Sequence, residues 1–164
     1  MVNVCMEIDT TRDIAHQIVR HRSFAFQEFS QRYANPEEMG DMFVKREARL
    51  QDNKNRQNSI ETDDERLQMM WDSKQGEVIR AAQDAYNWAI ENGIAKEQAR
   101  AVLPEGLTKS RLYVNGTIRS WIHYIQVRAG VETQLEHRMI AQDVKEIFKT
   151  ELPAVYEAVF SEAG

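Results

Sequence analysis

Residues 63–93 read DDERLQMMWDSKQGEVIRAAQDAYNWAIENG, and they form the longest stretch of the sequence that keeps a helical hydrophobic period. Asp63 or Asp64 is suited to cap the N-terminus of such a helix, and Gly93 is suited to end it. The stretch therefore predicts one long helix with a single apolar stripe facing inward. The residues of that stripe are Leu67, Met70, Trp71, Val78, Ala82, Ala85, Trp88 and Ala89.

Shorter patterns on both sides of this helix predict a mostly helical chain with very little sheet. We expect a strand at residues 2–8, a helix that follows residue 11 and runs to about residue 20, an extended segment at 23–33, a short polar helix at 36–50 and a loop at 52–59. Further helices are expected at 96–103, 116–129 and 132–150, and Pro153 is expected to open a last one. The elements predict one α+β domain over residues 1–164, mostly helical, with a small sheet packed on long helices. Because one or two strands do not make a stable sheet, we expect oligomerisation to complete it.

The charge balance of the chain is acidic, with 26 Asp and Glu against 21 Lys and Arg and a net charge of −5. This balance argues against non-specific nucleic-acid binding, which needs a basic surface. No run approaches the roughly 18–20 apolar residues of a membrane span, and residues 1–7 lack the basic start of a signal peptide. Cys5 is the single cysteine, which excludes a disulfide framework and a thiolate zinc site. We therefore expect a cytoplasmic protein without a metal site.

Residues 20–32, RHRSFAFQEFSQR, carry most of the chemical information in the sequence. Residues 20–22 are three potential cations in a row at a predicted helix end, which is unfavourable unless an anion meets them. In an extended stretch Glu28, Ser30 and Arg32 share one face. An acid, a hydroxyl and a guanidinium side by side can bind the edge of a polar heterocycle and its phosphate. The alternative from the residues alone is a cluster of Arg–Glu ion pairs with aromatic core residues between them.

This segment resembles the signature of the flavin-dependent thymidylate synthases, the ThyX family, which reads Arg-His-Arg-x-x-Ser-x-Asn-Glu-x-Ser-x-Arg. Ala25 stands where that pattern has Ser, and Gln27 stands where it has Asn. The positions that match are Arg20, His21, Arg22, Glu28, Ser30 and Arg32.

Four later elements resemble the same family and follow in its order. Residues 99–104, ARAVLP, are similar to its Ala-Arg-x-Val-Leu-Pro element, and residues 118–124, IRSWIHY, to its helix ending in His-Phe. Residues 127–128, VR, are similar to the Leu-Arg that comes next, and residues 133–138, TQLEHR, to its Ala-Gln-x-Glu-Ile-Arg element. The resemblance therefore covers nearly the whole chain.

The resemblance implies a homotetramer with shared active sites that makes dTMP from dUMP. Family members use bound FAD, with NADPH and methylenetetrahydrofolate as co-substrates, and the reduced flavin supplies the hydride. No enzyme cysteine attacks the uracil ring in this family. That agrees with the interpretation of Cys5 as inert packing within an apolar strand.

The resemblance also implies which residues bind each ligand. The match predicts that FAD is bound by Arg20, His21, Arg22, Glu28, Thr117, Arg119 and His123. It predicts that dUMP is bound by Gln17, Arg20, Glu28, Phe29, Ser30, Gln31, Arg32, Arg100 and Arg128, with Arg32 and Arg100 at the phosphate. Arg128 matches the family's activating arginine, which would stabilise negative charge on the uracil ring. Ser30 is interpreted as a hydrogen-bond donor. These groups, from neighbouring protomers, are expected to converge on one anion pocket.

Some positions depart from the family pattern. The sequence begins at or just before the strand that leads into the signature, so we expect a form without the family's preceding N-terminal segment. Thr117 replaces an Asn, and Glu132 stands where some members carry a His. Two alternatives stay open at this point. One is a catalytically silent or altered-specificity nucleotide-binding homologue, and the other is a helical interaction module whose arginines make only ion pairs.

Overall fold

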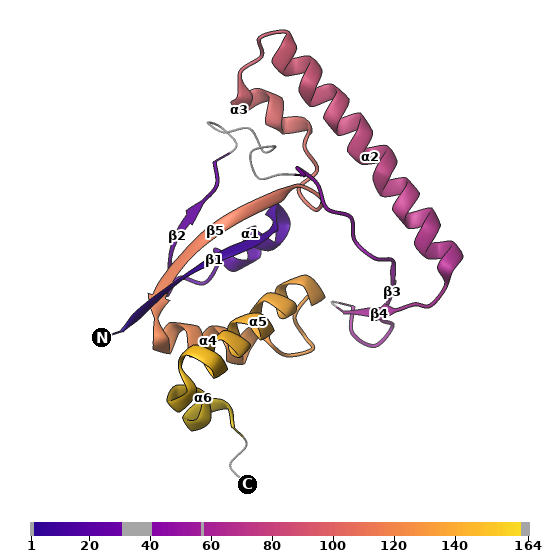
Figure 1. Ribbon diagram of the computed structural model, residues 1–164. Coiled ribbons are helices and arrows are strands. Elements are labelled where there is room, and N and C mark those ends of the chain that lie inside the picture. Colours follow the sequence, from indigo (N-terminus) through magenta and orange to yellow (C-terminus); the bar gives the residue numbers. More distant parts are fainter. Residues whose placement is uncertain (1, 31–40, 57, 162–164) are drawn as a thin grey trace.

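A computed structural model of the chain describes residues 2–30, 41–56 and 58–161. Its elements follow in the order β1 (Asn3–Thr11), α1 (Arg12–Ile18), β2 (Ala25–Glu28), β3 (Arg49–Gln51), β4 (Ser59–Glu61), α2 (Glu65–Glu91), α3 (Lys96–Ala99), the 3₁₀ helix η2 (Arg100–Val102), β5 (Lys109–Thr117), α4 (Ile118–Arg128), α5 (Leu135–Glu151) and α6 (Pro153–Phe160) (Figure 1). Most residues in these elements are helical, so the predicted α+β, mostly helical class is confirmed. Within the described ranges, no helix combines the length and the apolar composition that crossing a membrane requires.

The main sheet has three antiparallel strands in the order β1-β5-β2, with β5 in the centre. In its register Leu112 lies opposite Ile8, and Val114 lies opposite Met6. Side chains alternate between the two faces of a sheet, and these four are all buried in one cluster. The sheet therefore contributes one face to the core of the protein.

The sequence patterns do not predict β5, so the expectation of one or two strands is wrong for the described residues. The reason is a weak period of two, since the buried positions of β5 include Ser110 and Gly116 beside Leu112 and Val114. Two small or polar residues among four inward positions blur the contrast between the two faces. β1 and β2 lie at the edges of the sheet, and completion by oligomerisation stays a prediction.

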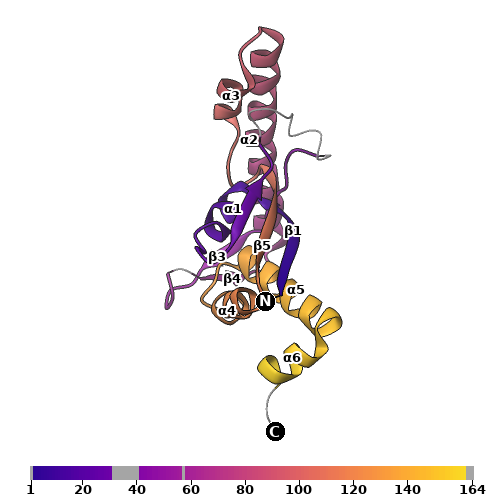
Figure 2. The ribbon, with the colours of Figure 1, turned by 90° about the vertical axis from the view of Figure 1, so that its left-hand side faces the viewer.

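Three helices pack their apolar sides against the buried face of the sheet. The buried residues of this core come from α1 (Ile14, Ala15 and Ile18), α4 (Trp121, Tyr124 and Ile125) and α5 (Ala141, Val144 and Phe148). The turn from β5 into α4 is fixed by Thr117, whose side-chain oxygen accepts a hydrogen bond from the Ser120 N–H. In Figure 2, α4, α5 and α6 lie below the sheet, while α2 and α3 extend above it. The end of α4 is thereby brought next to the end of α1.

The long helix α2 is confirmed from its cap onward, because the Asp64 side chain accepts a hydrogen bond from the Leu67 N–H. In Figure 1 it runs along the outside of the molecule, and the extended segment 44–48 lies between it and the sheet. Two glutamines connect α2 to that segment through main-chain hydrogen bonds. The Gln75 amide bonds the N–H and C=O of Arg46, and the Gln68 amide bonds those of Ala48, at 2.8–2.9 Å.

The predicted apolar stripe of α2 is only partly buried. Ala82 and Ala89 are buried, and Tyr86, which was not assigned to the stripe, is 1% exposed. Leu67 is half-buried, and four other large members of the stripe are 44–61% exposed in the single chain: Met70, Trp71, Val78 and Trp88. Because Gln68, Gln75 and Tyr86 face the rest of the chain, the helix turns much of its apolar surface to solvent.

Two shorter segments differ from the sequence expectations. Residues 41–48 form no helix and lead into β3, so the predicted polar helix is wrong for residues 41–50, and residues 36–40 lie outside the described ranges. The loop prediction holds for the described residues up to 58, while Ser59 begins β4, which pairs with β3. The segment predicted as extended at 23–33 forms β2, and its last three residues are not described.

Cys5 is not part of the core. It lies on β1 next to the buried Met6, and the alternation of the strand turns its side chain to the exposed face. The interpretation of Cys5 as packing is therefore wrong, although its place in a strand is confirmed.

Candidate functional site

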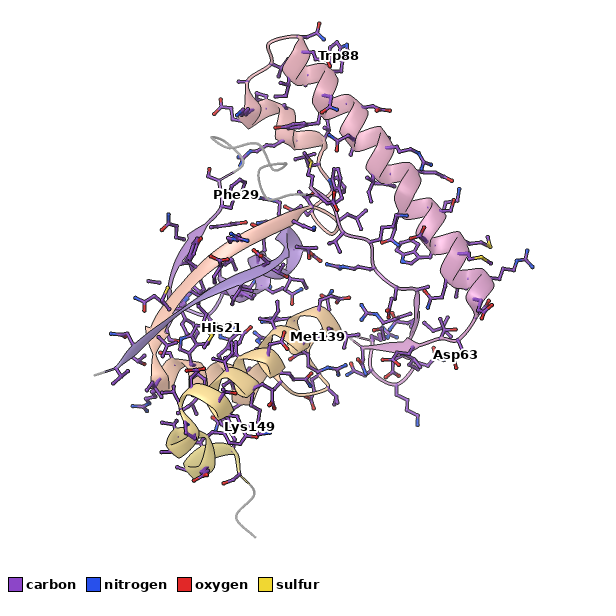
Figure 3. The ribbon with its side chains drawn as sticks, viewed as in Figure 1. His21, Phe29, Asp63, Trp88, Met139 and Lys149 are labelled. Atoms are coloured by element: carbon purple, nitrogen blue, oxygen red, sulfur yellow. The ribbon has the colours of Figure 1, made fainter. Side chains whose placement is uncertain are left out.

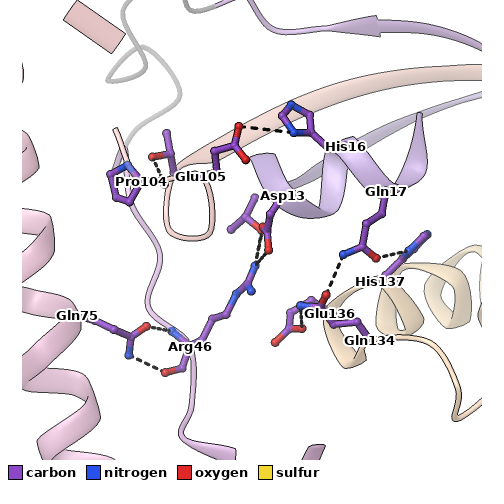
Figure 4. Close-up of polar contacts among 12 residues, drawn as sticks. Asp13, His16, Gln17, Arg46, Gln75, Pro104, Glu105, Gln134, Glu136 and His137 are labelled. Carbon is purple, nitrogen blue, oxygen red and sulfur yellow. Dashed lines mark hydrogen bonds and ion pairs between the residues drawn. The ribbon is translucent and has the colours of Figure 1, made fainter. Parts of the chain in front are cut away.

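A polar cavity of about 360 Å³ lies where the C-terminal ends of α1 and α4 meet the loop before β5. Asp13, His16 and Gln17 are three and four positions apart on α1, so they share one face of that helix. Arg20 follows the end of α1, and Arg128 is the last residue of α4. The residues that line the cavity are Asp13, His16, Gln17, Arg20, Glu105 and Arg128 (Figure 4 shows several of them).

One of the two carboxylates of the cavity, Asp13, is already paired with a cation, whereas its two guanidinium groups have no carboxylate partner. Asp13 forms an ion pair with Arg46 at 2.7 Å, and Glu105 faces His16 at 3.7 Å. Within the described ranges, neither Arg20 nor Arg128 forms an ion pair with a carboxylate. Two uncompensated guanidinium groups at one cavity indicate a site for an anionic ligand.

Arg128 is held by a neighbouring histidine rather than by an acid. Its Nε–H donates to Nε2 of His21 at 2.9 Å. Burial, together with the charge of Arg128 and the nearby His123, lowers the pKa of His21, so its ring is neutral at pH 7 and can accept this bond at Nε2. The bond uses only Nε of the guanidinium and leaves both terminal NH₂ groups of Arg128 available to a ligand. In Figure 3, His21 lies on the side of the sheet that faces α4 and α5.

Gln17 is connected to the start of α5 by a chain of polar contacts (Figure 4). Its Nε2 donates to Oε1 of Gln134 at 2.8 Å, and Nε2 of Gln134 donates to Oε2 of Glu136 at 3.0 Å. Glu136 in turn forms an ion pair with Arg49 of β3. Oε1 of Gln17 lies 3.3 Å from Nδ1 of the fully buried His137. These contacts fix the conformation of a side chain that lines the cavity.

The burial of His137 predicts that acid destabilises the fold. Burial, and then the charges of Arg128 and His21, lower the pKa of His137 to about 4, while an unfolded histidine titrates near 6.5. Between those values the unfolded chain binds the extra proton, so the free energy of unfolding falls as pH drops from about 6.5 to 4. The shift corresponds to about 3 kcal/mol, which is fully present above pH 6.5. Urea unfolding at pH 7.5 and pH 4.5 measures it, and His137→Leu is expected to show a smaller loss. An equal loss in both proteins would contradict this assignment.

A larger cavity of about 620 Å³ lies beside the first, between the end of β1, segment 44–49 and the start of α5. Its guanidinium groups are already engaged, Arg46 by Asp13 and Arg49 by Glu136. An anionic ligand there would have to break an existing ion pair before it gained a guanidinium group, although Lys109 also lines this cavity. For this reason we assign the site to the smaller cavity.

The structure brings some of the predicted site residues together and not others. Gln17, Arg20, His21 and Arg128 gather around the cavity within one chain. Arg100 lies in η2 and donates from Nε to the Glu97 carbonyl at 3.3 Å, and it does not line the cavity. Convergence of Arg100 on this site is therefore not found within a single chain.

The remaining predicted residues lie elsewhere on the sheet and on α4. Glu28 accepts a hydrogen bond from the Ser110 hydroxyl at 2.7 Å, and Phe29, at the end of β2 (Figure 3), extends the strand pairing. Ser30 follows, and Gln31 and Arg32 lie outside the described ranges. The predicted FAD-binding residues Arg22, Arg119 and His123 are exposed, and Thr117 caps α4.

Sequence reasoning gave no role to Gln134 or His137, although both lie in the 133–138 element. The spacing of Gln134 and His137 places them one turn apart on or near α5, but no local pattern says that both meet Gln17. Only the packing of α5 against α1 reveals that both residues contact Gln17.

Comparison with known proteins identifies the family to which this sequence belongs. The family described as thymidylate synthase complementing protein, Thy1, matches residues 1–154. The chain belongs to this family. The resemblance to the flavin-dependent thymidylate synthases, first seen in the Arg-His-Arg signature, is thereby confirmed.

Two relatives in the Thy1 family share nearly half of their aligned residues with this chain. A probable flavin-dependent thymidylate synthase of Paramecium bursaria Chlorella virus 1 is 47% identical over 154 residues, which cover 94% of this chain and 69% of that protein. A flavin-dependent thymidylate synthase of Synechocystis is 47% identical over 159 residues, covering 97% and 72%. The crystal structure of a UMP/dUMP methylase, PolB from Streptomyces cacaoi, bound with 5-Br UMP, has a TM-score of 0.77 at 22% identity and covers 95% of this chain and 72% of that one. The last comparison supports the fold.

Proposed function

We propose that this chain is a flavin-dependent thymidylate synthase, which methylates dUMP reductively to dTMP with bound FAD, methylenetetrahydrofolate and NADPH. Membership of the Thy1 family and 47% identity to proteins of that name support the activity. The main structural support is the position of the Arg128 guanidinium. Its Nε–H donates to His21, and it lines a cavity together with Arg20 and Gln17. Nothing observed favours a catalytically silent homologue.

In this proposal the cavity binds dUMP through groups that donate hydrogen bonds. The terminal NH₂ groups of Arg128 face the uracil and stabilise the negative charge that develops on its nitrogen and carbonyl oxygen. A fixed donor of this kind contributes typically a few kcal/mol, because it needs no reorganisation when the charge appears. Arg20 and Gln17 supply further donors. Residues 28–32 and Arg100 complete the pocket from a neighbouring protomer, and of the described ones neither Glu28 nor Arg100 lines the cavity of its own chain.

The residues present fit the binding of FAD. A dinucleotide carries two phosphates and needs cationic donors that are free of other partners. Arg22 and Arg119 are exposed, and within the described ranges neither forms an ion pair. We assign them to the cofactor with Arg20, His21, Glu28, Thr117 and His123. Bound flavin supplies the reducing equivalent as a hydride, and the residues of this chain hold the ligands in place.

The exposed apolar side of α2 supports assembly into a homotetramer. Large contiguous apolar surfaces on a protein usually mark an interface. Met70, Val78 and Trp88 lie on one side of this helix and are 49–61% exposed. We assign their burial to contacts between copies of the chain, in a cytoplasmic enzyme.

The purified protein tests the proposal directly. It is expected to be yellow, or to become yellow after incubation with FAD, and to oxidise NADPH faster when dUMP is added. With methylenetetrahydrofolate it is expected to release dTMP. Cys5→Ala should keep this turnover, because Cys5 does not line the cavity. A protein that stays colourless with FAD, or a folded but inactive Cys5→Ala variant, would contradict the proposed chemistry.

A further inference from the structure

His137 is a buried histidine to which nothing described so far gives a function. It lies in the first turn of α5 with its side chain fully buried, and its ring packs 5.7 Å from that of Tyr124. Within the described ranges its Nε2 has no hydrogen-bond partner. A buried polar atom without a partner costs free energy, so a leucine or isoleucine would fill this place at lower cost. The other ring nitrogen, Nδ1, faces Gln17.

The direction of each hydrogen bond near His137 can be worked out from Glu136. A carboxylate paired with Arg49 only accepts hydrogen bonds, so the Gln134 group that faces it must be the NH₂. Oε1 of Gln134 then points to Gln17 and must accept from its NH₂ at 2.8 Å. Oε1 of Gln17 is consequently left facing His137, and Nδ1 of His137 must carry the proton.

We infer that His137 is a positioning residue: its Nδ1–H donates to Oε1 of Gln17 and thereby holds the Gln17 amide in one orientation at the anion cavity. Without this donor Oε1 of Gln17 has no partner, and only the bond from its NH₂ to Gln134 still opposes a rotation that would present the carbonyl, which an anionic or carbonyl-bearing ligand repels. With it, the Gln17 NH₂ keeps a second N–H free for the ligand beside Arg20 and Arg128. The inference rests on the proposed function only in taking dUMP as that ligand.

The titratable groups around His137 are compatible near pH 7 with the hydrogen bond from its Nδ1–H to Gln17. Arg128 and His21 face it from α4 and from the segment after α1, and Tyr124 packs on it from α4. Arg128 keeps its charge and disfavours a second positive charge nearby. A neutral ring with one proton is the form that the hydrogen-bond chain requires.

Binding of dUMP to the FAD-loaded protein tests the inference by calorimetry. His137→Leu removes the donor and fills the space, and it is expected to weaken dUMP binding about fivefold, the effect of one net hydrogen bond. His137→Asn keeps a donor near the position of Nδ1 and is expected to stay within about twofold of the wild type. Tyr124→Phe, a control in the same cluster that does not contact Gln17, is expected to bind dUMP like the wild type. The flavin absorbance should be the same in all four proteins.

Three outcomes would overturn the inference: wild-type affinity in His137→Leu, no recovery in His137→Asn, or an equal loss in Tyr124→Phe. A wild-type protein that binds FAD but not dUMP would instead count against the proposed function. In that case nitrogen-15 NMR of histidine-labelled protein without ligand still decides the inference, with His137→Asn used to assign the signal. A proton on Nδ1 of His137 is expected, and a proton on Nε2 would overturn it.

Discussion

Replacement of Arg128 by alanine is expected to lower kcat by about 10²- to 10³-fold, the usual effect of removing one fixed donor from a developing anion. The side chain lines the cavity and is not part of the buried core, so the fold should persist. FAD should stay bound, because the residues assigned to it remain. Steady-state dTMP formation measures kcat, while the flavin spectrum and circular dichroism report the bound cofactor and the fold.

Two matched variants make the Arg128 result interpretable. Arg128→Lys keeps a positive charge but loses the Nε–H that donates to His21, so it should recover only a small part of the activity. Arg66→Ala removes an exposed arginine from the first turn of α2, which does not line the cavity, and should behave like the wild type. Wild-type turnover in Arg128→Ala would remove the central element of the proposed mechanism.

Replacement of Trp121 by alanine is expected to cost about 3–5 kcal/mol of the free energy of unfolding, as for other large aromatic residues in cores. Trp121 is 1% exposed and packs against Phe24 with 4.6 Å between ring centroids. Its Nε1–H donates to the carbonyl of Val4 at 3.1 Å, which connects α4 to β1. The substitution therefore leaves a cavity and removes the hydrogen bond between α4 and β1 at once.

Urea unfolding at a fixed protomer concentration measures this cost, because association stabilises the folded chain by mass action. Trp121→Phe keeps most of the ring contacts and loses the hydrogen bond, so it should cost clearly less than the alanine variant. A loss below about 1 kcal/mol in Trp121→Ala would mean that the junction of α4 with β1 does not hold the core together.

The helices were the predictable part of this fold because their signals are local. The cap at Asp64, the period of α2 and Pro153 at the start of α6 each lie within a few residues of the element that they define. The strand β5 was not predictable in this way. Its inward positions include Ser110 and Gly116, and these are covered by residues distant in the sequence, Ser110 by Glu28 and Gly116 by the Phe24 ring.

The candidate site also has a part that the sequence predicts and a part that only the structure reveals. The Arg-His-Arg signature and Arg128 were found through resemblance, which identifies residues but not their contacts. The bond from Arg128 to His21 spans 107 positions of sequence, and that between Gln17 and Gln134 spans 117. No period or spacing encodes such pairs, since they depend on how α1, α4 and α5 pack. The failed prediction of a helix at 41–50 has a similar cause, because that segment is extended against α2 by Gln68 and Gln75.

At positions 46 and 48, Gln68 and Gln75 bind only main-chain atoms and make no hydrogen bond to the side chains there. Each carboxamide takes one N–H and one C=O from the passing chain, as a neighbouring strand would. These four hydrogen bonds can form with any residue at positions 46 and 48 except proline, which has no N–H to donate. The side chains at these two positions are therefore constrained by other contacts, Arg46 by its ion pair with Asp13 and Ala48 by its burial, and not by the attachment of the segment to α2.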